Sequence, residues 1–227
     1  MAKFCTNCGK ELKDGKCDCV KVEKTSVISN FINEYIDVLK AIFLKPIDTI
    51  KENSKETNFL FGLISLGIVS LLSGLFTYFV LSEGLSKISA GFMFGMRSMY
   101  KVSFIKTFLS GLIISIAWYS VLAFMIYLIA SKLFKDKLTV KEAFAFLGVL
   151  SVFLAPVVLL SIVLIFVSIK LMTIVLLAAS MFYMVYFVQG LMEITKIDKN
   201  RIACLYVPAI LLTLFIVYYI LPRLLSL

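Results

Sequence analysis

The sequence predicts an all-α integral membrane protein, in which a small four-cysteine zinc ribbon and an amphipathic helix precede a five-helix transmembrane bundle. Three observations lead to this class: the apolar composition, five long uncharged stretches, and paired cysteines near the start. The 227 residues are 61% apolar and 16% charged. Soluble domains are about 45–50% apolar and about 25% charged, so the composition excludes a water-soluble fold and also an intrinsically disordered chain.

Residues 1–20 carry the most specific local motif. Cys5 and Cys8 form a C-x2-C pair, and Cys17 and Cys19 form a C-x-C pair. Four thiolates on two short turns can close tetrahedrally around Zn²⁺, and a segment without an apolar core would fold on the metal. We therefore expect a zinc ribbon with one structural Zn²⁺ ion. A redox-active dithiol pair and two disulfides are the alternatives.

Residues 21–58 are predicted to form a cytoplasmic amphipathic helix and linker. Between Val27 and Leu44, apolar side chains recur at helical spacing: Ile28, Phe31, Ile32, Tyr35, Leu39, Ile42 and Phe43. Such a helix either lies flat among lipid headgroups or docks on the bundle. Docking is favoured because the polar face carries two acids and only one lysine. Pro46 is expected at the first turn of a second short helix, over 47–55.

The region 59–227 is predicted to be a transmembrane domain. A span needs about 20 apolar residues, and five stretches without interior Asp, Glu, Lys or Arg meet this length: 59–82, 107–131, 143–169, 171–192 and 202–221. Only Lys170 separates the third stretch from the fourth, which predicts a tight helical hairpin; a different reading of this hairpin would give four or six spans. Pro156 is expected to kink the third span rather than end it.

The distribution of Lys and Arg predicts the orientation. Seventeen lie in the tail and in the loops 132–142 and 193–201, whereas six lie in the segments across the bilayer. The positive-inside rule then places the protein in the cell membrane with the N-terminus in the cytoplasm and the C-terminus outside. The surplus charge of +9 flanks the spans, so membrane lipids are expected partners. A nucleic-acid partner would need a basic stripe on a soluble surface, and none is visible.

The predicted spans contain hydroxyl groups in place of ionisable ones, as at Ser65 and Ser161. Small residues recur at four-residue spacing in Ser70-x3-Gly74 and Gly111-x3-Ser115, which predicts close helix approach. Helix packing is favoured over a substrate pathway at these positions. No catalytic residues are expected, because the chain has neither histidine nor a cluster of carboxylates in its spans.

The chain carries two resemblances to known families. The stretch FCTNCGKEL with the following CDC resembles the short zinc ribbon in front of many bacterial membrane proteins. From Phe43 onward the chain resembles the Yip family of five-span membrane proteins, through LKPIDTI before the first span, KEAFAFLGVLSVFLAP at the third, and the short hairpin into the fourth. The resemblance implies a cytoplasmic N-terminus and no catalytic residues. Eukaryotic proteins resembling this fold bind small GTPases and shape vesicles, but their Asp-Leu-Tyr-Gly-Pro element has no counterpart here.

These observations favour a non-enzymatic membrane scaffold or adaptor whose cytoplasmic zinc ribbon recruits a cytoplasmic or membrane protein, with a homo-oligomer left open. The alternative is a transporter or channel subunit for a neutral or lipid-like substrate, with Pro156 as a hinge. An enzyme acting on lipids is the least favoured class, since the sequence offers no catalytic group for it.

Overall fold

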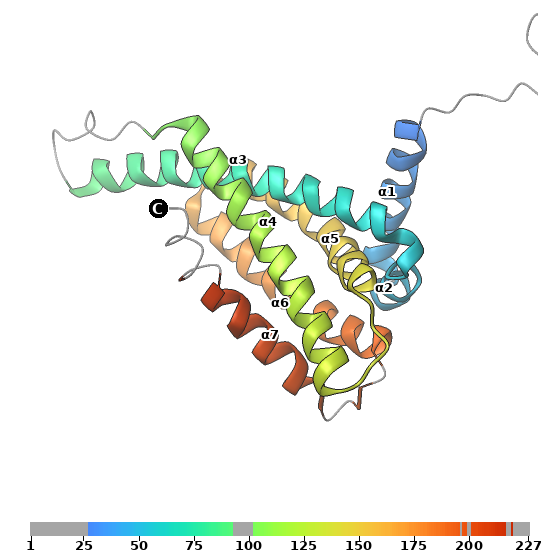
Figure 1. Ribbon diagram of the computed structural model, residues 1–227. Coiled ribbons are helices and arrows are strands. Elements are labelled where there is room, and N and C mark those ends of the chain that lie inside the picture. Colours follow the sequence, from blue (N-terminus) through green and yellow to red (C-terminus); the bar gives the residue numbers. More distant parts are fainter. Residues whose placement is uncertain (1–26, 93–101, 196, 199–200, 217–218, 220–227) are drawn as a thin grey trace, which may run out of the picture. The chain divides into compact units, whose positions relative to one another are not determined.

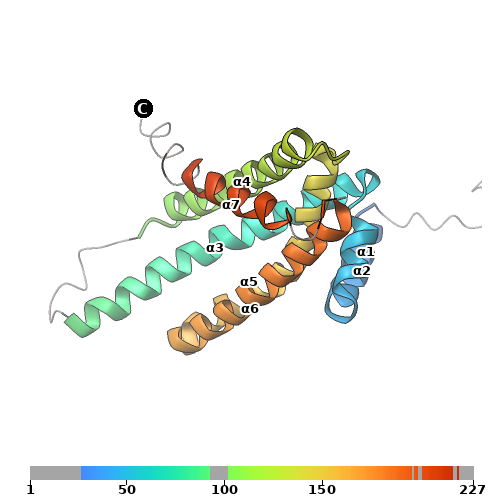
Figure 2. The ribbon, with the colours of Figure 1, turned by 90° about the horizontal axis from the view of Figure 1, so that it is seen from below.

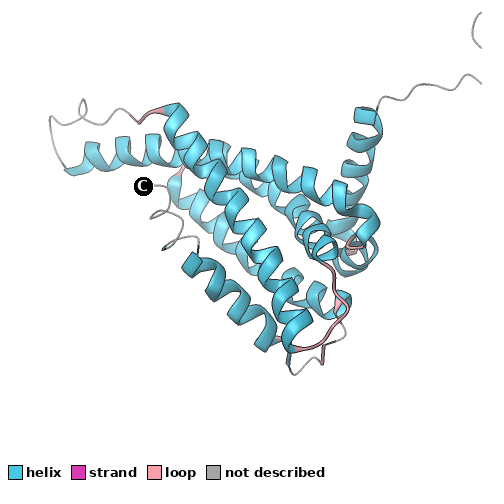
Figure 3. Cartoon of the chain, viewed as in Figure 1, coloured by secondary structure: helices cyan, strands magenta, loops and turns pink. Residues whose placement is uncertain are grey.

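The computed structural model describes residues 27–92, 102–195, 197–198, 201–216 and 219 (Figure 1). The chain divides into two units, residues 1–34 and residues 35–227, and the second unit contains the long apolar helices. The described part of the chain is helical apart from short loops and turns (Figure 3). Its elements, in chain order, are α1 (Val27–Leu44), α2 (Pro46–Asn53), the 3-10 turn η1 (Glu56–Asn58), α3 (Phe59–Phe92), α4 (Phe104–Leu128), the π-helical turn η2 (Ile129–Leu133), α5 (Val140–Val167), α6 (Ile169–Ile194) and α7 (Ala203–Phe215).

Four helical segments are long and apolar enough to cross a membrane: Glu56–Glu83, Phe104–Leu133, Val140–Val167 and Ile169–Ile194. The predicted all-helical class is therefore confirmed for the described residues, and the four apolar segments are compatible with a membrane location. The fifth predicted span, 202–221, contains α7, which has 13 residues; residues 217–218 and 220–227 lie outside the described residues. A total of five spans stays a prediction.

The hairpin between the third and fourth long helices turns at Ser168, and the prediction that Lys170 separates them was wrong. Ser168 is extended (φ −161°, ψ 119°), and its hydroxyl accepts a hydrogen bond from the backbone N–H of Leu171 at 3.4 Å. Serine is a preferred N-cap because its oxygen satisfies a helix donor that has no intrahelical partner. Lys170 consequently lies in the first turn of α6. The capping residue, not the charge, fixes the turn.

Helix α5 forms the core of the unit. Its N-terminal half is buried almost completely from Ala143 to Phe153. Both views place α6 beside α5 and α7 beside α4 (Figures 1 and 2), and the rings of Phe146 on α5 and Phe187 on α6 lie 5.6 Å apart. Pro156 lies within α5, and the helix continues on both sides of it. The predicted kink at Pro156 stays a prediction.

Small residues bring three helices into backbone contact. A Cβ placed on Gly148 of α5 would overlap the backbone of Gly62 on α3, and one placed on Gly62 would lie 2.8 Å from Cα of Ala145. This crossing was not predicted from the sequence. Close approach without a side chain between the helices is the packing that membrane bundles use.

The second crossing, between α3 and α4, was predicted. A Cβ on Gly111 would lie 3.1 Å from Cα of Gly74, and the hydroxyl of Ser115 donates a hydrogen bond to that of Ser70 at 3.2 Å. The two small-residue motifs therefore face each other, which confirms the packing role assigned to them.

Candidate functional site

The predicted zinc ligands Cys5, Cys8, Cys17 and Cys19 lie outside the described residues. The zinc ribbon and its single ion therefore remain predictions. In the unit 35–227, polar groups gather at one end of the bundle, and the candidate site lies there.

Helix α2 covers the end of the bundle where α5 begins and α6 ends; we call this the charged end. Pro46 occupies the first turn of α2, as predicted, and Ile50 is completely buried. A Cβ on Gly190 of α6 would lie 2.9 Å from Cγ2 of Ile50. The absence of a side chain at Gly190 thus gives Ile50 room to pack closely on α6.

Two ion pairs join the linker to the helix ends. Nζ of Lys51 lies 2.7 Å from Oε2 of Glu193, and Nζ of Lys141 lies 2.6 Å from Oε1 of Glu56. All four side chains are exposed by more than a third. Exposed pairs contribute little to stability because water and salt screen them, so they orient α2 and η1 while the apolar contact of Ile50 supplies the larger share of the docking energy.

The ion pair of Lys51 predicts that the docking of α2 weakens at alkaline pH. Its hydrogen bond to Glu193, followed by the attraction of that carboxylate, raises the pKa of Lys51 above the ordinary 10.5. A raised pKa gives a contribution that is complete below pH 10.5 and is lost as the pH rises through the folded-state value. We expect the opening equilibrium of α2, measured by hydrogen exchange and corrected for the intrinsic exchange rate of its amides, to stay constant from pH 7 to 9. Above pH 10.5 the open fraction of α2 should rise slightly. Lys51→Gln should remove the rise; a rise that persists in this variant would assign it to another group.

The end of the amphipathic helix α1 is docked on the same unit. Val38 and Ile42 are buried, and the ring of Phe43 lies 5.5 Å from that of Phe153 on α5. Docking, the favoured alternative in the sequence, is thus confirmed for residues 35–44.

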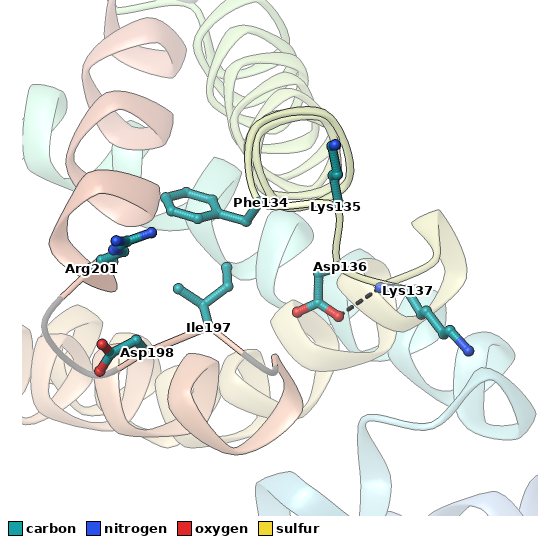
Figure 4. A pocket seen from close by; sticks show the side chains of 7 residues that line it. All are labelled: Phe134, Lys135, Asp136, Lys137, Ile197, Asp198 and Arg201. Carbon is teal, nitrogen blue, oxygen red and sulfur yellow. Dashed lines mark hydrogen bonds between the residues drawn. The ribbon is translucent and has the colours of Figure 1, made fainter.

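A pocket of about 320 Å³ opens between the turn that follows η2 and the segment that precedes α7 (Figure 4). We call it the loop pocket. Its lining combines basic, acidic and apolar side chains: Phe134, Lys135, Asp136, Lys137, Ile197, Asp198 and Arg201.

The turn after η2 has an unusual backbone. The π-helical turn ends at Leu133, and the backbone N–H of Asp136 donates to the carbonyl of Ala130 at 3.0 Å. Lys135 has a φ of 55°, in the left-handed region that glycine usually supplies at a helix C-terminus. For a residue with a Cβ this conformation costs about 1–2 kcal/mol. A left-handed residue at this position lets the chain leave the helix end, as common C-terminal caps do.

The side chains of the loop pocket have distinct directions. Asp136 points toward Ile197, and Arg201 extends from the start of α7 toward Phe134, whereas Lys135 and Lys137 point away from the other labelled side chains (Figure 4). The backbone N–H of Lys137 donates to Oδ1 of Asp136 at 2.6 Å and fixes that carboxylate. The backbone N–H of Arg201 donates to the carbonyl of Asp198 at 2.8 Å. Asp198 points away from Asp136 (Figure 4), so the wall of the pocket presents the guanidinium of Arg201, the carboxylate of Asp136 and the ring of Phe134.

A second pocket, of about 340 Å³, lies between α3 and α4 within the apolar segments. Its lining includes the hydroxyl-bearing residues Ser73, Thr77, Ser115 and Tyr119. The hydroxyl of Thr77 donates to the carbonyl of Ser73 at 2.7 Å, and that of Ser115 donates to Ser70. The hydroxyl of Thr77 is thus bonded within α3, and that of Ser115 links α4 to α3.

One protein family matches most of the chain. The family described as a domain of unknown function (DUF6574) matches residues 24–223. The chain belongs to the DUF6574 family. No curated protein and no solved structure matches it. The matched DUF6574 region contains the charged end and both pockets, and the four paired cysteines precede it.

Proposed function

We propose that this protein is a non-enzymatic multi-pass scaffold or adaptor of the cell membrane, of the Yip type, whose cytoplasmic zinc ribbon recruits a protein partner. One observation carries the proposal. Backbone contacts join three of the four long apolar segments of the described chain, and the Asp, Glu, Lys and Arg residues of all four lie only in the first or last few positions. A rigid bundle with an ordered polar end is suited to holding a partner at a membrane surface.

The orientation belongs to the same proposal. The charged end, the tail and the lysine-rich loops would face the cytoplasm, following the excess of Lys and Arg on that side, and the C-terminus would lie outside. A cytoplasmic ribbon would keep its four thiols reduced and available to zinc.

The experiment removes the ribbon and leaves the bundle. Cys5→Ser/Cys8→Ser is expected to lower the zinc content of the purified protein from about one ion per chain to none, because a structural site needs four ligands. Crosslinking in the native membrane should then recover no partner, while membrane insertion is unchanged. Cys204→Ser, which alters a cysteine on α7, is the control and should keep both zinc and partner. Unchanged partner recovery without zinc would count against the adaptor.

A transporter or channel subunit for a neutral or lipid-like substrate is the second candidate, because of the hydroxyl-lined pocket between α3 and α4. Flux through liposomes that contain the purified protein is the measurement. Liposomes that stay impermeable to neutral solutes and to labelled lipid under all gradients would remove this candidate.

A further inference from the structure

We propose that the corner between α1 and α2, formed by residues 43–46, inserts among the acyl chains of the lipid leaflet at the charged end. We call these residues the α1–α2 corner. The inference rests on the membrane insertion of the proposed function. It does not depend on the zinc ribbon or on a protein partner.

The docked part of α1 runs along the bundle away from the charged end. The ring of Tyr35 lies 6.2 Å from that of Phe61, close to the start of α3, whereas the ring of Phe43 reaches Phe153 on α5. Phe153 lies about 20 Å along α5 from the first residue of that helix. Since α5 is about 42 Å long and a hydrocarbon layer is about 30 Å thick, Phe153 lies at the level of the acyl chains.

Helix α2 returns from this level to the charged end. Ile50 packs against Gly190, and Lys51 pairs with Glu193, so both contacts lie near the end of α6. The α1–α2 corner, where the two helices meet (Figure 2), is therefore the part of this linker that lies deepest in the apolar layer.

The α1–α2 corner exposes apolar side chains at this depth. Leu44 is 81% exposed and Phe43 is 53% exposed. Ile36 is also exposed and lies two turns earlier on the same face of α1, whereas Val38 and Ile42 on the adjoining face are buried. Helix α1 thus places one apolar strip on the protein and leaves a second strip open, as helices at a membrane interface do.

Contacting rings connect the α1–α2 corner to the outer surface of α6. The ring of Phe153, beside Phe43, lies 5.4 Å from that of Tyr186, which lies 6.4 Å from that of Phe182. Phe182 is an exposed residue within the apolar segment of α6. The corner therefore adjoins a surface that a membrane-spanning helix presents to lipid, which favours acyl chains over a protein as its occupant.

The backbone of the corner is suited to an apolar layer, in which unpaired N–H and C=O groups are costly. The N–H of Lys45 donates to the carbonyl of Ala41 at 2.7 Å. The carbonyl of Lys45 accepts from the N–H of Thr49 at 3.0 Å and from its hydroxyl at 2.7 Å. Pro46 has no N–H to satisfy. Both backbone groups at the turning residue are thus paired within the chain.

The charged side chains near the corner balance one another. Lys40 and Lys45 are exposed, and so are Asp37 and Asp48. A lysine can lay its apolar stem among acyl chains and hold its ammonium at the headgroups. Because two lysines stand beside two aspartates, the corner should bind by apolar contact, without a preference for anionic lipid.

Tryptophan fluorescence tests the depth of the corner. Trp118 is the single tryptophan of the chain, so Leu44→Trp is made in a Trp118→Phe background and placed in phosphatidylcholine vesicles with brominated acyl chains. An interfacial helix buries its apolar face about 5–10 Å, so bromine should quench Leu44→Trp about threefold more strongly than the control Glu52→Trp, on the exposed face of α2. Aqueous iodide should show the reverse order. Melting curves show that the variants are folded.

Three results would overturn the inference. Equal quenching of Leu44→Trp and Glu52→Trp by iodide would place the corner in water, and quenching of Leu44→Trp by neither agent would place it against a second copy of the chain. A need for phosphatidylglycerol would assign the binding to headgroup charge. Trp118 of the unaltered protein separates the two proposals, because bromine should quench it if α4 lies in the bilayer. Its failure to be quenched would contradict the proposed function itself, whereas quenching of Trp118 without Leu44→Trp would remove only the inserted corner.

Discussion

Replacing Gly148 by alanine is expected to push α3 away from α5 and to lower the free energy of unfolding by about 3 kcal/mol. The new Cβ would overlap the backbone of Gly62, and a backbone cannot rotate aside as a flexible side chain can. The two helices would have to separate along their contact. Thermal unfolding of the purified protein in detergent measures the loss.

Gly67→Ala is the matched control for Gly148→Ala. Gly67 also lies on α3, but a Cβ there meets no atom within 4 Å, so this variant should melt at the temperature of the unaltered protein. The double variant Gly62→Ala/Gly148→Ala should lose less than the sum of the single losses, because both changes act on one contact. Equal melting of Gly67→Ala and Gly148→Ala would contradict the close crossing of α3 and α5.

Replacing Ile50 by alanine is expected to release α2 from the charged end. Ile50 is fully buried against α6, and truncation of a buried isoleucine costs about 2–5 kcal/mol. Hydrogen exchange of the α2 amides should therefore speed up strongly while the apolar helices keep their protection.

Lys51→Gln serves as the comparison for Ile50→Ala. It removes an exposed ion pair, so the docking of α2 should weaken much less than in Ile50→Ala. If Lys51→Gln opened α2 more than Ile50→Ala, the ion pair and not the apolar contact would hold the helix.

The helical class could be predicted because long uncharged segments have few other solutions in a membrane. The start of α2 at Pro46 and the facing of Ser70-x3-Gly74 with Gly111-x3-Ser115 also follow from local sequence rules. Helix α5 begins at Val140, earlier than predicted, because Thr139 and Glu142 form a capping box. This signal is visible in the sequence and was missed.

The crossing of α3 with α5 and the composition of the loop pocket could not be predicted from neighbouring residues in the sequence. Asn58 and Leu66 lie four positions before and after Gly62. Neither is a small residue of the kind that forms a four-residue packing motif, so no such motif identifies Gly62 as a contact position. Phe134 and Arg201 are far apart in the chain, and only the return of α6 brings their two loops together. The left-handed Lys135 has no sequence signature, since the position normally selects glycine or asparagine.

The length of the apolar helices has a consequence for the surrounding lipid. The four apolar segments contain 26 to 30 residues each, or about 39–45 Å of helix, while the hydrocarbon layer is about 30 Å thick. Hydrophobic mismatch of this size is relieved by tilting or by local thickening of the bilayer. Acyl-chain length should therefore alter the tilt of the bundle, and thicker regions of a membrane should accommodate the protein with less strain than thin ones.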